Sequence, residues 1–150
     1  MREELKKWEQ ISSSDPAEVV DHIPRVASEL DHDEGEVRNT AVTILSQVAK
    51  EYPGDVSEVT PSLIRVLDDE HTAVRYNALL AISRISNQDI TPILDHLQDI
   101  AGKLNDGDED VRGMSVDILK KTNESYPKEV SNCVDVAIEN LLLKTDSEDE

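Results

Sequence analysis

The sequence is poor in several residue types, and each shortage excludes a class of protein. Cys133 is its only cysteine, so no internal disulfide can form. Phenylalanine is absent and aromatic residues make up 3% of the chain. No apolar run approaches the roughly 18 residues that a membrane-spanning helix needs, and the stretch Met1 to Gln10 lacks the apolar segment of a signal peptide. We therefore expect a cytoplasmic protein without a membrane partner.

Positive charge is also scarce, with 15 Lys and Arg against 33 Asp and Glu and a net charge of -18. Such a surface repels the phosphate backbone of nucleic acids, so we expect no nucleic-acid partner. Two explanations of the acidity remain open. One is adaptation to high salt, as in a halophilic archaeon, and the other is attraction of a basic partner.

An internal repeat organises what is present. The pair Val37-Arg38 recurs as Val74-Arg75 and as Val111-Arg112, with a spacing of 37 residues each time. The same offset aligns further sets of positions, which are Leu30/Leu67/Leu104, Ala41/Ala78/Ser115, Leu45/Ile82/Leu119 and Val19/Val56/Ile93/Val130. A fixed period of this length is typical of repeat arrays.

Apolar residues within each repeat follow a helical spacing. In the first repeat they form two amphipathic faces, Val19/Ile23/Val26/Ala27/Leu30 and Val37/Ala41/Leu45/Val48. Polar segments at 31–36, 68–72 and 105–110 separate the two faces and indicate turns. The pattern predicts a helix, a turn and a second helix in every repeat.

The ends of the chain fit the same register, which gives about eight helices in all. Leu5, Trp8 and Ile11 fall on second-helix slots of a truncated leading repeat. Because a single hairpin cannot bury its apolar face, stacking creates the core and the outer helices act as caps. The expected organisation is a capping helix at 1–14, three repeats within 15–127 (15–51, 52–88 and 89–125), a capping helix at 128–144 and an acidic tail at 145–150.

The repeat unit resembles the HEAT repeats of the armadillo-like families over residues 16–144. The likeness rests on Pro24 and Pro61 inside the first helix, a leucine before an acidic turn, and Val-Arg followed three residues on by a small residue. Gln98 and Asp135 depart from the proline slot, and the period is shorter than the usual 40 to 47 residues or so. The resemblance implies an all-α, right-handed superhelical α-solenoid that serves as a binding scaffold.

One arginine per repeat, Arg38, Arg75 and Arg112, stands at the base of the second helix. The resemblance implies that such an arginine pairs with an acidic turn residue of a neighbouring repeat, here Asp69 or Asp106. The planar guanidinium suits this role because it can satisfy a carboxylate and backbone carbonyls together.

The residues that catalysis would need lack the required spacing. No histidine is followed by glutamate, as the iron sites of HEAT-like hydroxylases would require, and His22 and His96 lie two repeats apart. The segment 105–110 has its glycine at the third position, which does not fit a calcium-binding EF-hand loop. Cys133 lies on an apolar face with no basic residue nearby. We expect no catalytic residue, metal or cofactor.

We therefore expect a non-catalytic scaffold or adaptor that binds a protein or peptide. If the acidity of the chain serves to attract a partner, that partner is basic. The residues expected to face the partner, on the concave surface that the resemblance implies, are Thr43, Gln47, Tyr76, Leu80, Arg84, Met114 and Lys121. Tyr, Met and Arg are enriched in interfaces. In the alternative interpretation, Leu80 and Met114 pack against each other between repeats.

Two other functions stay open, a HEAT-like metal-dependent or lyase-type enzyme and an acidic mimic of nucleic acid. The expected oligomeric state is a monomer or a weak end-to-end dimer, because Leu141, Leu142 and Leu143 give the last helix an apolar edge.

Salt should stabilise this protein. Most carboxylates lack a cationic partner, and a screening length of about 3 Å at 1 M salt relieves their repulsion. We expect the melting temperature to climb between about 0.05 M and about 2 M KCl. Charge-neutralising variants separate this effect from salting-out, and a flat or falling curve contradicts the high-salt interpretation.

Overall fold

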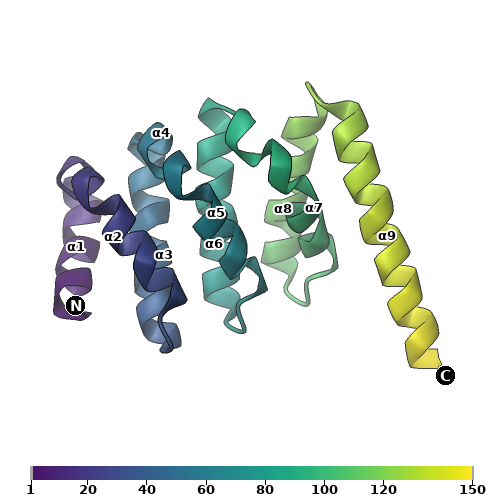
Figure 1. Ribbon diagram of the computed structural model, residues 1–150, viewed down its shortest axis with the longest axis horizontal. Helices are drawn as coiled ribbons and strands as arrows, with labels where there is room; N and C mark the ends of the chain where they lie inside the picture. The colour runs from purple at the N-terminus through teal and green to yellow at the C-terminus, as the bar shows by residue number, and fades with distance from the viewer. Residues whose placement is uncertain (1, 150) are drawn as a thin grey trace.

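The computed structural model describes the backbone of residues 2–149 and the side chains of residues 2–143. Within that range the chain is helical and has no strand, and its helices stack side by side along one axis in two layers (Figure 1). The second-helix layer consists of α1 (Arg2–Ser14), α3 (Gly35–Glu51), α6 (Thr72–Gln88) and α8 (Glu109–Asn123). The all-α solenoid of eight helices is confirmed. None of the described helices could span a membrane.

The other layer holds the first helix of each repeat, and these helices are broken where the sequence predicts single ones. The first comprises η1 (Pro16–His22), α2 (Ile23–Ser28) and η2 (Glu29–Asp31). The second comprises α4 (Pro53–Val56), η3 (Ser57–Val59), α5 (Thr60–Arg65) and η4 (Val66–Asp68). The third comprises η5 (Thr91–His96), α7 (Leu97–Gly102) and η6 (Lys103–Asn105). Short 3-10 segments thus flank a short α-helical centre each time.

The bend before the α-helical centre lies at the same slot in all three repeats. His22, Val59 and His96 have φ of -104°, -106° and -117° with ψ near zero. A proline follows two residues after the first two of them, but Gln98 follows the third. Proline is therefore compatible with the bend but is not required for it.

The last helix is continuous and longer than expected. α9 runs over Pro127–Asp149 without a break, although the sequence suggests a capping helix over 128–144 followed by an acidic tail at 145–150. Asp135, at the proline slot, lies within it. Helical backbone therefore extends past the position at which each earlier first helix turns back.

One slot on the second helices holds a small, fully buried residue in every repeat. Ala41, Ala78 and Ser115 share one slot, and each is 0% exposed. Ser115 keeps its hydroxyl satisfied in this buried position because Oγ donates to the carbonyl of Ile100 at 2.6 Å. Neighbouring second helices, α3 with α6 and α6 with α8, contact each other directly along the array.

The arginine series joins successive repeats as the resemblance implies. Arg38 Nε donates to Asp69 Oδ2 at 2.6 Å, and Arg75 Nε donates to Asp106 Oδ2 at 2.9 Å. Nη1 of Arg75 also donates to the carbonyl of Asp69, within its own turn, at 2.9 Å. These side chains are almost buried, with 12% and 6% exposure for the first pair. The expected pairs of arginine and aspartate, which we call the ladder, are confirmed at these two junctions between repeats.

The ladder has no carboxylate at its C-terminal end. Arg112 Nη1 donates to the carbonyl of Asp106 at 2.8 Å, as its counterparts do within their own turns. One repeat beyond Asp106 the chain carries Leu143. Among the side chains of residues 2–143, none offers a carboxylate to Arg112.

The two aspartates of the ladder remain ionised more readily than an isolated carboxyl. Burial acts to raise the pKa of Asp69, but hydrogen bonds from Arg38 and His71 outweigh burial and lower that pKa below its usual value. The pKa of Asp106 is lowered in the same way, against its burial, by Arg75 and the backbone N–H of Asp108. Folding therefore favours the charged form of both groups.

Removing one ladder arginine should destabilise the fold far more than removing a surface arginine. Arg38→Ala leaves the almost buried carboxylate of Asp69 without its guanidinium partner, and we expect a loss of about 3 kcal/mol in urea unfolding. Arg65→Ala is the matched control, because its pair with Asp31 is 58% and 64% exposed and should contribute about 0.5 kcal/mol. Equal losses of unfolding free energy in the two variants would show that the ladder pair stabilises the fold no more than a surface ion pair.

The ladder should also make the free energy of unfolding depend on pH in the acid range. The folded-state pKa of Asp69 is lowered, so its contribution is present above the unfolded pKa of about 3.9 and is lost as pH falls below that value. We expect the free-energy difference between wild type and Asp69→Asn to be constant near pH 7 and to shrink below about pH 4. Urea titrations across this range measure it, and a pH-independent difference refutes the assignment.

Candidate protein-binding face

The second-helix face is the outer surface of α3, α6 and α8, and it carries all the residues that the sequence places at an interface. Thr43 and Gln47 lie on α3, Tyr76, Leu80 and Arg84 on α6, and Met114 and Lys121 on α8. Every one of these side chains is half-buried. They are therefore partly accessible and partly packed against neighbouring helices.

Two of these residues meet in one cleft between α6 and α8, which we call the Tyr76 cleft. Its volume is about 360 Å³. The lining residues are Tyr76, Glu109, Asp110, Gly113, Met114 and Asp117. Tyr76 and Met114 form its floor, because both pack against the hydrophobic core.

Three carboxylates surround this apolar floor. Glu109, Asp110 and Asp117 are exposed, and none of them has a cationic partner among the described side chains. A lysine or arginine side chain matches such a site, because its aliphatic stem packs on apolar surface while its charged end stays near carboxylates. An aromatic ring and a thioether add favourable contacts with that stem and charge. The Tyr76 cleft can therefore bind a cationic side chain.

Gln47 and Arg84 lie elsewhere on the face, where α1, α3 and α6 converge. They line a cleft of about 400 Å³ with the three serines of Ser12–Ser14, and a neighbouring cleft of about 390 Å³ shares Lys50 and Arg84. The Oε1 atom of Gln47 contacts the hydroxyl of Ser12, and Arg84 Nη1 donates to the carbonyl of Ser46 at 2.6 Å. Both side chains therefore already link adjacent second helices.

The structure does not gather all seven residues into one site. Thr43, Leu80 and Lys121 line none of these three clefts. Sequence reasoning, in turn, missed Glu109 and Asp110, which belong to the first turn of α8 and look like ordinary helix-starting acids. The signal that could have found Asp110 is the helical spacing, since it stands one turn before Met114 on α8.

Groups that could hold a metal are dispersed. Among the described residues, no three His, Cys, Asp or Glu side chains gather closely enough to hold a metal ion. The ring of His22 instead stacks on Trp8, with centroids 4.8 Å apart. Cys133 is buried, and burial raises the pKa of its thiol.

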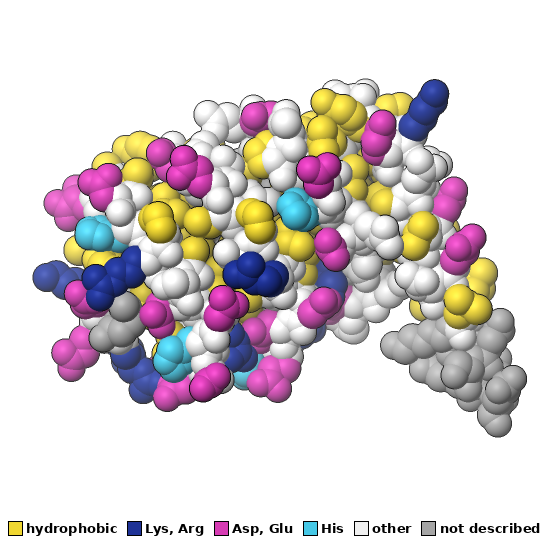
Figure 2. Space-filling view, in the orientation of Figure 1, with side chains coloured by type: hydrophobic (Ala, Val, Ile, Leu, Met, Phe, Trp, Pro, Cys, Tyr) yellow, Lys and Arg dark blue, Asp and Glu magenta, His cyan; other side chains and the backbone are white. Residues whose placement is uncertain are grey.

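Acidic side chains are not confined to the second-helix face. Figure 2 shows the opposite side of the molecule, where the first-helix layer faces the viewer and carboxylates are scattered over most of the surface. Asp95 and Asp99, one helical turn apart in this layer, are both exposed. What distinguishes the Tyr76 cleft is therefore the combination of carboxylates with a hollow that has an apolar floor.

Comparisons with known proteins support this architecture. The family model for Cnd1, described as non-SMC mitotic condensation complex subunit 1, matches residues 10–109 and 36–150. A designed armadillo repeat protein in complex with the peptide (KR)4 is similar in structure, with a TM-score of 0.74, 22% identity and coverage of 89% of this chain and 62% of the designed one. An engineered protein from a structural genomics consortium has a TM-score of 0.68 and 19% identity, covering 93% of this chain and 72% of its own. No curated protein matches the chain.

These likenesses concern shape. The chain spans about three fifths of the length of the designed armadillo protein. At such low identity the shared feature is the fold, an array of helices with an extended surface along its axis.

Proposed function

The chain belongs to the Cnd1 family of condensation complex subunits, and from that membership we propose that it is a non-catalytic scaffold that binds a partner protein or peptide on its second-helix face. Repeat arrays present long surfaces along which a partner can lie. The partner is proposed to be basic and to contact the face through Lys or Arg side chains.

The observation that carries the proposal is the Tyr76 cleft. An apolar centre with a charged rim is the usual anatomy of an interface. Its three carboxylates attract a cation, and the net charge of -18 steers a basic partner toward the molecule from a distance. The similar designed protein is in complex with (KR)4, a peptide of alternating lysine and arginine.

The (KR)4 peptide is also the probe that tests the proposal. We expect fluorescence anisotropy to show saturable binding to the wild-type chain at moderate salt. Tyr76→Ala should weaken that binding by about 1 to 3 kcal/mol, as the loss of an interface anchor does. The double change Asp110→Asn with Asp117→Asn should weaken it by a similar amount, since both carboxylates line the cleft.

A matched double variant separates the cleft from the general field of the protein. Asp95→Asn with Asp99→Asn removes the same charge from the first-helix layer and should lower affinity only slightly. Equal losses in the two double variants would mean that the peptide follows net charge alone. Unchanged binding in Tyr76→Ala and in the cleft double variant would place the partner elsewhere.

A further inference from the structure

The C-terminal end of the array exposes apolar positions that every earlier repeat buries. Val42 on α3 and Leu79 on α6 share one slot, and each is 0% exposed. Val116 holds the same slot on α8 and is 41% exposed. The following second helix covers this slot in the first two repeats, and none of the described helices covers it on α8.

The same contrast holds for the first-helix layer. Ala27, Ile64 and Ala101 are 4%, 9% and 0% exposed, whereas Ile138, their counterpart on α9, is 51% exposed. Leu142, one turn further along α9, is 58% exposed. α9 thus keeps the apolar pattern of a helix that packs against a hairpin partner.

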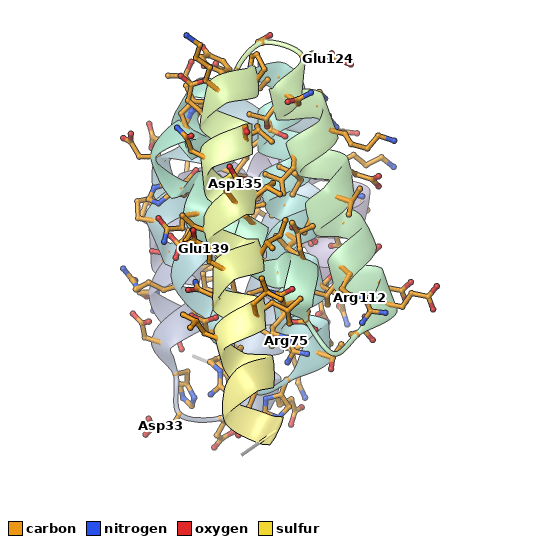
Figure 3. The ribbon with its side chains drawn as sticks, turned by 90° about the vertical axis from the view of Figure 1, so that its right-hand side faces the viewer. Asp33, Arg75, Arg112, Glu124, Asp135 and Glu139 are labelled. Carbon is orange, nitrogen blue, oxygen red and sulfur yellow. The ribbon has the colours of Figure 1, made fainter. Side chains whose placement is uncertain are left out.

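The two helices form a groove between them, which we call the α8–α9 edge. It holds about 230 Å³ and is lined by Leu104, Val116, Leu119, Lys120, Asn123, Val130 and Val134. Figure 3 looks onto this end of the molecule and shows α9 beside α8, with Glu124 at the upper end of α8 and Arg112 near its lower end. The groove is therefore open at the end of the stack.

The ladder of arginine and aspartate pairs also ends at the α8–α9 edge. Arg38 and Arg75 each pair with an aspartate that stands three residues before the next second helix, Asp69 before Thr72 and Asp106 before Glu109. Arg112 is the next member of this series, and its counterpart carboxylate is missing among the described side chains. An open apolar groove and an arginine without its aspartate thus lie at one end of the array.

We propose that the α8–α9 edge binds an amphipathic α-helix of a partner protein, and that an acidic residue about one turn before this helix pairs with Arg112. The helix takes the place against α8 that α6 takes against α3. Its apolar residues fall on one face at helical spacing and cover Val116 and Ile138. The site continues the packing already seen between α3, α6 and α8, and it is separate from the Tyr76 cleft.

Within the described residues, the chain does not turn back to fill this groove. The three earlier first helices turn back after Asp31, Asp68 and Asn105, but α9 continues as a helix to Asp149. Its residue at the ladder slot is Leu143, which cannot pair with Arg112.

A second copy of the chain does not suit the groove either. The side of α1 that faces away from α3 has no helix against it among the described residues, and it carries Lys7 at the slot where Ile44 is buried on α3. This charge would be desolvated against Val116 and Ile138. Two copies that each carry a charge of -18 also repel each other.

The chain itself supplies a probe with the required features. A labelled peptide of residues 69–88 contains Asp69 followed by α6, which is the segment that fills the equivalent place against α3. The changes Ala73→Lys and Asn77→Asp in this peptide allow a lactam bridge between the two side chains, formed with loss of water, which keeps the short segment helical in isolation. We expect saturable binding of this peptide to the full chain in fluorescence anisotropy.

Three variants of the protein locate the bound peptide. Val116→Asp, Ile138→Asp and Arg112→Gln should each weaken binding at least about tenfold. Asn132→Asp is the matched control and should leave binding unchanged, because its slot is exposed in every repeat, as Asp21, Glu58 and Asp95 show. Circular dichroism verifies that each variant keeps its helix content.

Failure of the peptide to bind, or equal affinity in all variants, overturns the proposal. Sedimentation provides an independent check on the occupant of the edge. A concentration-dependent dimer that Ile138→Asp dissociates would assign the edge to a second copy and overturn the partner helix.

Discussion

Each hairpin of this array buries its apolar side only against the hairpins before and after it, and the arginine to aspartate pairs hold that stacking in register. Apolar contact between helices is tolerant of small slips, whereas a guanidinium that bonds both a carboxylate and a backbone carbonyl is directional. Arg38 and Arg75 make these bonds at both internal junctions. The positions of the clefts between successive second helices follow from this register.

The arginines are used largely for contacts between helices. Of the seven arginines, five pair with carboxylates, namely Arg2, Arg25, Arg38, Arg65 and Arg75. Arg84 spans α6 and α3 through a backbone carbonyl. Among the described lysines only Lys103 forms an ion pair, and none of them pairs with Asp110 or Asp117, so these two carboxylates retain their field for a partner.

Much of the fold could be read from the sequence because the 37-residue period repeats the same slots. The slot of Ala41, Ala78 and Ser115 is small in every repeat, and the structure buries it each time. The ladder was also foreseeable, since both of its members recur with the same period.

The structure differs from the sequence-based expectations at a few particular residues. The bend at His96 occurs without a proline, so no single residue reveals it. α9 continues past the slot at which the three earlier first helices end, and its residue there is Leu143, where the earlier repeats carry the polar residues His32, Asp69 and Asp106. The acids of the Tyr76 cleft look like helix-starting residues until α6 and α8 are placed side by side. Nothing in the sequence reports that juxtaposition directly.

The two ends of the stack are finished differently, and this has a consequence for self-assembly. A protein with complementary binding surfaces at its two ends can associate head to tail into an open filament. Lys7, on the side of α1 that faces away from α3, replaces the apolar residue that such growth would need. The exposed apolar positions of α8 and α9 therefore have no matching apolar surface on α1 of a second copy.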